Sequence, residues 1–419
     1  MNGLLNCDWN TKEKLITTIN EWKEQFPVIH EFVVSDDGEK ISAVVEIENK
    51  KVSPCINGKT WENTYERVWS PLFSHDNQLI CSVLQNYEWT VAIDDVLWED
   101  KFDYVWNLRL SPDGKSIAAN IKKGNEYGIS LNGKTWDKMF FDARDIVISP
   151  DGMKTASYVK VKNPPPLDIF SCSKGIWTVA INGSPWDKSF ISIRGLAFSS
   201  DSNKIASGVR LDVLEFTIAV DGNLWEETFK CVWEPVFRPG SSDVVAPVKT
   251  AKGWTLAMNG KPIWDRYFTQ VWRQQYSRDG QRIAAVVAPE FGKWTIVVDS
   301  QLWKRTYSDA VLSPVFSPDG KRVAAIVKEN NRWTIAVDGT AWETDFDMVW
   351  EPVFSPDSDR VAAKTERNGK FFTVIDGKVG KQGFEALWNP VFSPDGGKIL
   401  IRCIDDGKYY RRIVQIDEI

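Results

Sequence analysis

The chain has 419 residues, of which 43% are hydrophobic, and its formal net charge at pH 7 is −6. The apolar content is ample for a large core, whereas the negative charge gives no electrostatic support to nucleic-acid binding. No run approaches the ~20 apolar residues of a membrane-spanning helix, and the N-terminus MNGLLNCDWNTKEK lacks the features of a secretion signal. We therefore expect a cytoplasmic protein with no direct membrane insertion and no nucleic-acid partner.

The first element in chain order is a short amphipathic helix, expected within residues 10–25. Leu15, Ile19 and Trp22 recur at helical spacing, and Asn10 or Thr11 offers a capping side chain.

After this segment the sequence repeats one unit about ten times. A Ser-Pro-Asp-Gly turn or a variant of it marks each unit, and its first residue serves as the anchor. Successive anchors lie 37 to 40 residues apart, except for one interval of 50. The anchors are Ser35, Ser74, Ser111, Ser149, Ser199, Arg238, Ser277, Ser317, Ser355 and Ser393. Each unit holds four short apolar segments separated by Gly-containing turns, with no helical periodicity between them. This pattern predicts an all-β fold, a β-propeller of four-stranded blades.

The two ends of the sequence complement each other. The last unit has three strands but stops at Ile419 without the Trp-containing segment that follows the Asp/Asn-Gly turn elsewhere. Residues 22–26 align with that missing segment. We therefore predict a ring closed by strands from both termini, which removes two exposed sheet edges. In this division, residues 1–26 form the helix and closing segment, and residues 27–419 form the propeller.

The tryptophans follow the repeat. Twenty of the 21 fall in three columns: after the Asp/Asn-Gly turn (Trp342 is one example), at the start of the strand before that turn (Trp333), and five residues before the anchor (Trp350). We expect these rings within and between the blades, because each can bury ~150–250 Å². A chain of rings for electron hopping or ligand stacking is the alternative.

The third tryptophan column has four substitutions, at His30, Arg144, Arg194 and Leu312. In a propeller the strand that enters the anchor turn is the innermost one, so these positions are expected near one mouth of the central channel. We predict a polar sector at this mouth. The alternative is that these residues reflect random sequence change in a solvent-filled channel. The sector comprises Arg144, Asp145, Arg194, Arg273, Gln274 and Gln275.

The interval of 50 residues contains an insertion, residues 161–175, with the sequence VKNPPPLDIFSCSKG. Three consecutive prolines impose extended geometry and prevent ladder hydrogen bonds. The insertion either folds back on its own blade or docks a partner protein. The candidate docking residues are Pro164, Pro165, Pro166, Leu167, Ile169 and Phe170.

Motifs for catalysis and cofactor binding are missing from the sequence. It has no Gly-rich phosphate loop, no nucleophile elbow and no His-Glu-x-x-His motif. Six cysteines are scattered without a Cys-x-x-Cys pair, and there are only two histidines. We therefore expect no enzyme activity, no metal or other cofactor, and reduced cysteines.

The Ser-Pro-Asp-Gly unit resembles the WD40-like, TolB-type propeller repeat, most clearly at Ser111, Ser149, Ser317 and Ser393. Units of the form WTIAVDG…W…F…VW…PVFSPDG also resemble the tryptophan-rich D subunit of the Tmc transmembrane redox complexes of sulfate-reducing bacteria. That resemblance implies a cytoplasmic accessory subunit without its own redox centre. Its partners would be a multihaem cytochrome c, an iron–sulfur subunit and a membrane subunit, through which it would associate with the membrane.

Two functions follow from these observations. The first is a non-catalytic interaction scaffold, an accessory subunit of a membrane-associated electron-transfer complex. The alternative is a propeller enzyme, or a binder of glycans or small molecules, that uses the mouth of the central channel.

Overall fold

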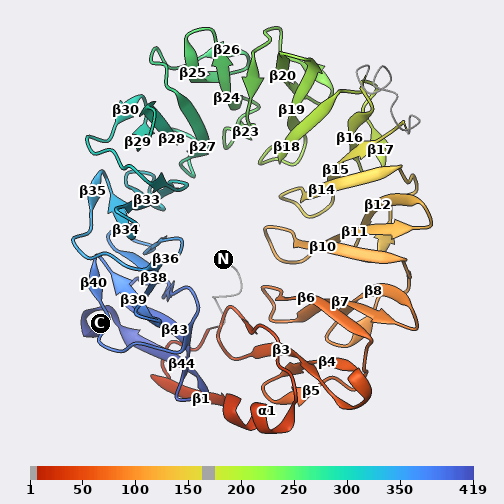
Figure 1. Ribbon diagram of the computed structural model, residues 1–419, viewed down its shortest axis with the longest axis vertical. Coiled ribbons are helices and arrows are strands. Elements are labelled where there is room, and N and C mark those ends of the chain that lie inside the picture. The colour runs from red at the N-terminus through yellow and green to blue at the C-terminus, as the bar shows by residue number, and fades with distance from the viewer. Residues whose placement is uncertain (1–6, 163–174) are drawn as a thin grey trace.

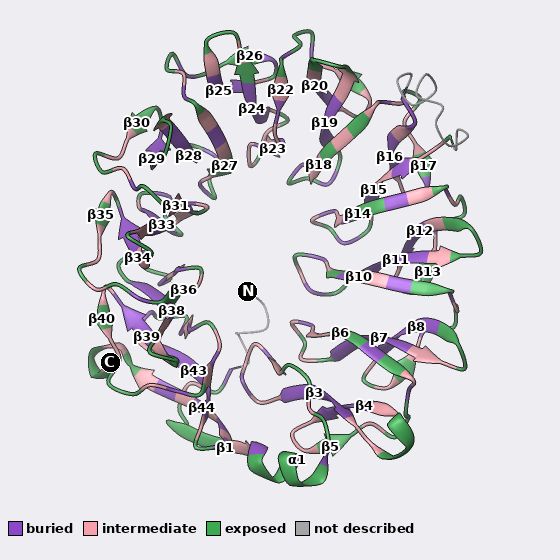
Figure 2. Cartoon of the chain, in the orientation of Figure 1, coloured by how far each residue is buried: buried purple, intermediate pink, exposed green. Residues whose placement is uncertain are grey.

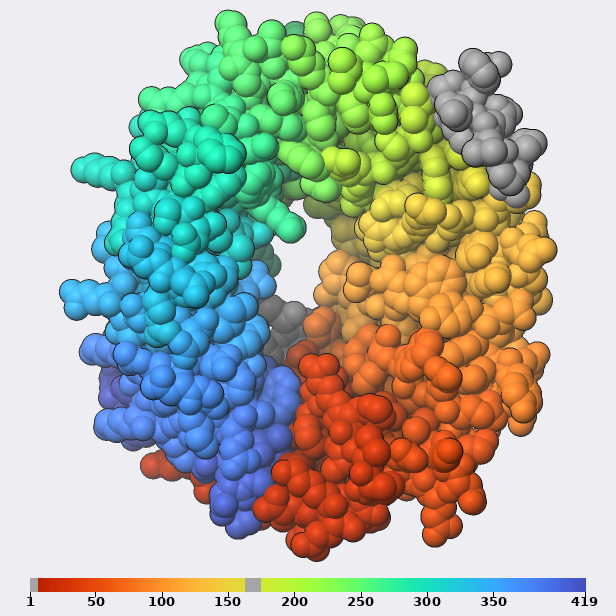
Figure 3. Space-filling view, viewed as in Figure 1, coloured from red at the N-terminus to blue at the C-terminus, as the bar shows by residue number. Residues whose placement is uncertain are grey.

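The computed structural model describes residues 7–162 and 175–419 of the chain. Ten antiparallel sheets stand around a central opening and form one ring (Figures 1 and 3). This arrangement confirms the all-β prediction of a ten-bladed propeller. Within the described ranges, the α-helical content is one short helix, α1 (Ile19–Gln25), and no helix there is long and apolar enough to cross a membrane.

Each blade contains four strand positions from the channel outward. The inner strands are β2 (Val33–Val34), β6 (Arg67–Phe73), β10 (Tyr104–Leu110), β14 (Asp142–Ile148), β18 (Ser192–Phe198), β22 (Cys231–Val232) with β23 (Val236–Phe237), β27 (Gln270–Tyr276), β31 (Ala310–Val311) with β32 (Val315–Phe316), β36 (Met348–Val349) with β37 (Val353–Phe354), and β41 (Ala386–Leu387) with β42 (Val391–Phe392). The second strands are β3 (Ile41–Glu46), β7 (Leu79–Gln85), β11 (Ile117–Lys123), β15 (Thr155–Lys160), β19 (Ile205–Asp212), β24 (Val244–Thr250), β28 (Ile283–Glu290), β33 (Val323–Glu329), β38 (Val361–Arg367) and β43 (Lys398–Asp405).

The two outer positions complete the blades. The third strands are β4 (Val52–Ile56), β8 (Glu88–Ile93), β12 (Glu126–Leu131), β16 (Trp177–Ile181), β20 (Glu215–Val220), β25 (Gly253–Met258), β29 (Lys293–Val298), β34 (Arg332–Val337), β39 (Lys370–Ile375) and β44 (Lys408–Gln415). The outermost strands are β5 (Lys59–Thr60), β9 (Val96–Leu97), β13 (Lys134–Thr135), β17 (Ser184–Pro185), β21 (Asn223–Leu224), β26 (Lys261–Pro262), β30 (Gln301–Leu302), β35 (Thr340–Ala341), β40 (Lys378–Val379) and, in the last blade, β1 (Glu13–Thr18). The described residues also include the 3₁₀ turns η2 (Glu48–Lys50) and η3 (Ile416–Glu418).

The second and third strands supply most of the core (Figure 2). In β28, six consecutive residues from Ile283 to Ala288 are buried, so residues on both faces of the strand are covered. Strands buried on both faces read as continuous apolar runs rather than as alternating patterns. The IAAVVA sequence therefore follows from packing each sheet between two neighbouring blades.

The repeated Ser-Pro-Asp-Gly sequence builds a hydrogen-bonded turn. In the blade of β33, Ser317 Oγ donates to Asp319 Oδ1 at 2.7 Å and accepts from the backbone N–H of Arg322 at 2.9 Å. Asp319 Oδ1 also accepts from Lys321 N at 3.0 Å. Gly320 has a φ of +74°, a conformation that suits glycine. These contacts explain structurally why the motif recurs from blade to blade.

Ring closure uses a different segment from the one predicted. β1 pairs antiparallel with β44, so the strand from the N-terminus spans residues 13–18 rather than 22–26. The helix prediction is correspondingly wrong for residues 10–18, because the outer edge of β44 offers backbone groups that a strand satisfies. The helix begins at Ile19 without a side-chain cap. Trp22 lies in this helix and packs in a cluster with Tyr409 of β44.

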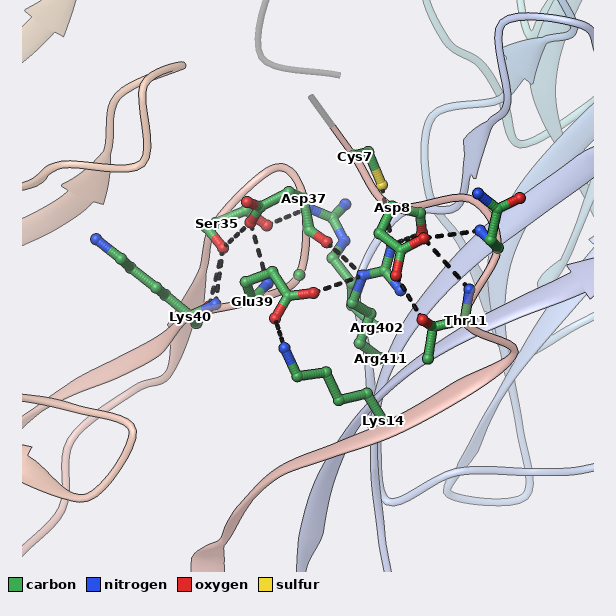
Figure 4. A network of polar contacts seen from close by, with 12 residues as sticks. Cys7, Asp8, Thr11, Lys14, Ser35, Asp37, Glu39, Lys40, Arg402 and Arg411 are labelled. Carbon is green, nitrogen blue, oxygen red and sulfur yellow. Dashed lines mark hydrogen bonds and ion pairs between the residues drawn. The ribbon is translucent and has the colours of Figure 1, made fainter. Parts of the chain in front are cut away.

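Two buried arginines of the last blade hold the closure together (Figure 4). The Arg411 side chain is fully buried; its Nε donates to Asp37 O at 3.0 Å and lies 3.3 Å from Glu39 Oε1. The same guanidinium donates to Asp8 O. Arg402 NH1 donates to Ser35 O at 2.9 Å. The last blade is therefore bonded both to the N-terminal segment and to the first anchor turn.

We expect Arg411→Met to destabilise the protein by about 2–4 kcal/mol, because it leaves buried carbonyl groups without donors. Reversible urea denaturation measures this loss. Arg332→Met is the control, since Arg332 forms exposed ion pairs with Asp345 and Asp347 that are each worth at most ~1 kcal/mol. Equal losses for the two variants would contradict a special role for Arg411 in closure.

The anchor turns also predict acid sensitivity. The Ser317 hydroxyl and the Lys321 N–H lower the pKa of Asp319, and six other turn aspartates shift in the same direction. A folded pKa below the unfolded value of about 3.9 stabilises the protein above that value. This stability is lost as the pH falls through the folded pKa.

The urea midpoint should therefore fall as the pH drops below about 4. Asp319→Asn should make this fall less steep than it is in the unmodified protein. Glu343→Gln, which removes an exposed carboxylate outside the turns, is the control. A pH profile that Asp319→Asn leaves unchanged would show that this turn does not contribute.

Candidate functional site

The two ends of the ring differ. The anchor turns lie at one end, which we call the turn face. The hairpins between the second and third strands lie at the other end, which we call the hairpin face. In the blade of β27, Trp272 pairs with Val286 and Gln270 with Ala288, close to the hairpin tip at Phe291. The third tryptophan column is therefore near the hairpin face, on the strands that line the channel.

The expectation that all three tryptophan columns are buried holds only in part. Trp22 and Trp264 of the first column are buried, whereas Trp342 is half-buried. No member of the third column is fully buried, and Trp69 is 38% exposed. The inner strands face the channel on one side, so their side chains lack a covering blade there.

Third-column rings pack against the aromatic residue that opens the third strand of the same blade. The ring centroids of Trp69 and Trp89 lie 4.7 Å apart, as do those of Trp272 and Trp294.

Contacts between neighbouring blades extend the first of these pairs into a row of five rings. Trp89 lies 5.5 Å from Tyr104, Tyr104 lies 5.5 Å from Trp106, and Trp106 lies 6.1 Å from Tyr127. The row spans the blades of β6 and β10.

The two arginine substitutions in the third column differ in their partners: Arg144 lies over the aromatic residue that opens the third strand of its own blade, and Arg194 over the third-column tryptophan of the next blade. The Arg144 guanidinium lies 4.7 Å from the ring centroid of Trp177, and Arg194 lies 4.5 Å from that of Trp233. Arg144 also pairs with Asp142 at 2.9 Å. A guanidinium stacks on an indole face through a cation–π interaction. These two positions are therefore filled by the chain itself.

At the other two substitutions the surface is hollow. The Leu312 hollow has a volume of about 770 Å³, and the His30 hollow one of about 910 Å³. The Leu312 hollow is lined by Trp233, Glu234, Trp272, Arg273, Trp294, Asp309 and Leu312. Residues lining the His30 hollow include His30, Glu31, Glu66, Arg67, Trp69 and Tyr104. The sequence singled out both substitutions but gave no sign that they would open cavities.

Two charged groups of the His30 hollow have partners within the chain, whereas the Glu31 carboxylate has no hydrogen bond or ion pair among the described residues. Glu66 pairs with Lys51 at 3.2 Å. The Arg67 guanidinium lies 5.8 Å from the ring centroid of Trp69.

The two acidic groups that line the Leu312 hollow form no ion pair among the described residues, but the Lys328 ammonium acts electrostatically on Asp309. The Glu234 side chain packs against Gly195 of the preceding blade, and its backbone oxygen accepts a hydrogen bond from Gln274 Nε2 at 2.6 Å. The Asp309 carboxylate accepts from Asn331 N at 2.8 Å and from Ser308 Oγ at 3.1 Å. These bonds lower the pKa of Asp309, so it is negatively charged at neutral pH. Trp233 Nε1 is buried without a partner.

The residues of the predicted polar sector lie on three inner strands, β14, β18 and β27. Asp145 is exposed with a φ of +60° and accepts a hydrogen bond from the N–H of Ile146. Arg273 and Gln275 are exposed, whereas Gln274 is 4% exposed and bonds to the neighbouring blade. The blade of β24 separates β18 from β27, so the six residues do not form one continuous cluster.

The candidate docking residues of the insertion, Pro164 to Phe170, lie outside the described residues. The insertion joins β15 to β16, where other blades carry a hairpin.

Comparisons with known proteins provide no family from which functional residues could be transferred to this chain. No protein family and no curated protein matches the sequence. Among solved structures, a chain described as a eukaryotic initiation factor matches with a TM-score of 0.47 and 11% identity, covering 90% of this chain and 98% of that one. The β-propeller domain of Myceliophteria thermophila Cps50 (Swd1) matches with a TM-score of 0.30 and 13% identity, covering 64% and 97%. The fold assignment therefore depends on the sheet topology of this chain.

We expect Leu312→Trp to be tolerated, because it restores the repeat residue beside an existing hollow. Filling a cavity typically stabilises by about 0.5–2 kcal/mol, and urea denaturation measures the change. Val323→Trp in the same blade is the contrasting variant, since Val323 is buried and overpacking costs about 1–3 kcal/mol. A loss for Leu312→Trp as large as that for Val323→Trp would show that the hollow cannot accept an indole ring.

Proposed function

We propose that this protein is a non-catalytic interaction scaffold and an accessory subunit of a membrane-associated electron-transfer complex. Propellers commonly provide binding surfaces for other proteins, and the fold alone does not select a function. The single observation that carries the scaffold role is the distribution of exposed apolar side chains between the two ends of the ring.

Large exposed apolar residues gather on the hairpin face. Tyr87 and Phe291 stand at hairpin tips and are 91% and 98% exposed. Further members are Val213, Leu214, Trp69, Tyr104, Phe141, Leu312 and Met348. On the turn face, within the described ranges, the large exposed apolar residues are Val96 and Met153. Exposed apolar and aromatic side chains concentrated on one face support a protein-binding role for that face.

The assignment to a redox complex is supported by the repeat sequence, which resembles the tryptophan-rich D subunit of the Tmc complexes. The partners proposed on this basis are iron–sulfur and membrane subunits, through which this protein associates with the membrane. Affinity purification from native membranes, with mass spectrometry of the co-purifying subunits, tests this part. Recovery of the protein alone from solubilised membranes would contradict it.

A second candidate function is an enzyme, or a binder of glycans or small molecules, at the channel mouth. The observation in its favour is the Leu312 hollow, which combines three tryptophans with two carboxylates. Its test is a ligand screen on the purified protein without partners.

We expect the double variant Tyr87→Ser with Phe291→Ser to weaken partner binding by roughly tenfold or more, since buried aromatic residues dominate interface energies. The melting temperature should hardly change, because both side chains are exposed. Co-purification and thermal unfolding are measured together. Val96→Ser with Met153→Ser on the turn face is the matched control, and equal losses of binding for the two pairs would contradict docking on the hairpin face.

A further inference from the structure

We propose that a hollow on the outer side of the blade of β24 binds an acidic segment of a partner protein. We call it the lysine hollow. It has a volume of about 410 Å³, and its lining includes Glu227, Phe229, Lys230, Lys249, Ala251 and Lys261. This inference rests on the proposed scaffold function and names the chemistry of one contact with the partner.

The lysine hollow lies where the outer part of this blade meets the segment that leads in from the preceding blade. Lys249 lies near the end of β24, and Lys261 opens the outermost strand, β26. Lys230 lies directly before the inner strand β22, and its backbone N–H donates to Lys249 O at 3.0 Å. The hairpin between β24 and β25 belongs to the hairpin face (Figure 1), so the hollow adjoins the surface proposed for partner docking.

The lining carries an excess of positive charge, because three lysines oppose the single carboxylate of Glu227. The ammonium groups of Lys230, Lys249 and Lys261 form no hydrogen bond, ion pair or ring contact with any residue that the structure describes. All three lysines are exposed, in a chain whose formal net charge is −6. At most one of the three charges could be balanced within the lining, so the counter-ions that this surface lacks have to come from another molecule.

Other repeats place an acid where this blade has Lys230. The backbone N–H groups of Glu66 and Asp347 donate to the second-to-last residue of the second strand, as that of Lys230 does. Their carboxylates then accept from the hairpin of the same blade. Glu66 Oε1 accepts from the backbone N–H of Asn86 at 3.2 Å, and Asp347 Oδ2 accepts from that of Asn368 at 2.7 Å. A lysine at this position reverses the charge beside the hairpin.

The hairpin of the β24 blade does not require that acid. Thr250 Oγ1 accepts from the backbone N–H of Lys252 at 3.1 Å and donates to Gly253 O at 3.0 Å. Lys230 therefore presents a cation beside a hairpin that is bonded by its own threonine. In four other blades the position is uncharged, with Phe141, Ile191, Thr269 and Ser308.

An acidic protein segment matches this lining better than a nucleic acid does. Ammonium groups form charge-assisted hydrogen bonds with carboxylates, and several carboxylates in sequence can pair with lysines from different segments of the blade. A nucleic acid carries its phosphates far beyond the hollow, where the negative net charge of this chain repels them. Val213 and Leu214, in the hairpin of the preceding blade, are 67% and 69% exposed and offer apolar contacts to the same partner.

The test uses two fluorescein-labelled peptides, Gly-Glu-Glu-Glu-Gly and its analogue with glutamine at the three central positions. Fluorescence anisotropy measures their binding to the purified protein, with inorganic phosphate as a competitor. We expect saturable binding of the glutamate peptide that weakens at high salt, and about tenfold weaker binding of the glutamine peptide. Equal binding of the two peptides would overturn the proposal. Displacement of the glutamate peptide by an equal concentration of phosphate would also overturn it, since that result indicates a site for single anions.

Variants of the lining test which side chains hold the peptide. Combining Lys230→Gln with Lys249→Gln should weaken binding of the glutamate peptide about tenfold, in line with the loss of two exposed ion pairs. Lys230→Glu should weaken binding further, because it places there the acid that Glu66 provides in another blade. Glu227→Gln should strengthen binding by removing a like charge. An unchanged affinity in the double variant would show that the peptide binds elsewhere and that the proposal is wrong.

A matched control exists in the blade of β10. Lys122 and Lys123 end β11, and Asp103 occupies the position of Lys230 in that blade. Combining Lys122→Gln with Lys123→Gln changes the net charge by the same amount and should leave the peptide affinity unchanged. If this pair weakens binding as much as the variant pair in the lysine hollow, the effect is general electrostatics and the proposal fails.

The outcome can be separated from that of the scaffold proposal. If native partners co-purify with the protein but the glutamate peptide fails to bind, the inference about the lysine hollow is wrong and the scaffold role stands. If the peptide binds as described but no partner protein is recovered, the scaffold proposal fails while the site for acidic segments is supported.

Discussion

Packing of each sheet between two others is the constraint on which the rest of this structure depends. A blade with one uncovered face would expose strands such as β28, in which six consecutive residues are buried. Only a closed ring covers all ten blades on both sides. The interface between the first and last blades therefore has to be as stable as the other interfaces between blades. The pairing of β1 with β44 and the buried guanidinium groups of Arg402 and Arg411 meet that requirement.

The same geometry explains where the surface becomes available for binding. An inner strand has a neighbour on its outer side but only the channel on its inner side, so third-column side chains are half-covered at most. A tryptophan at this position packs on the aromatic residue of the next-but-one strand, as Trp272 does on Trp294. An arginine stacks in its place, whereas Leu312 leaves a hollow. Single substitutions in the third column thus decide in which blades the channel-facing surface is filled by a side chain and in which it is hollow.

Under the proposed function, specificity would come from departures from the repeat. In the anchor turns, the serine and aspartate side chains form hydrogen bonds within the turn, as at Ser317 and Asp319. Few of their oxygen atoms are therefore left to accept hydrogen bonds from another molecule. By contrast, the Glu234 side chain is exposed, packs against Gly195 of the preceding blade and forms no ion pair among the described residues. Polar groups that the fold does not satisfy internally are the ones available to another molecule.

The sequence by itself determined the all-β class, the repeat number and the presence of a closing N-terminal strand, because each depends on local turn chemistry and on apolar runs with a fixed period. It misplaced that strand, since Leu15, Ile19 and Trp22 satisfy helical spacing equally well and only the open edge of β44 favours a strand at residues 13–18. The sequence also marked Leu312 and His30 as exceptions. Only the tertiary structure decided that these two positions open hollows while Arg144 and Arg194 fill theirs, because that outcome depends on side chains from neighbouring blades that are about 40 residues away in the chain.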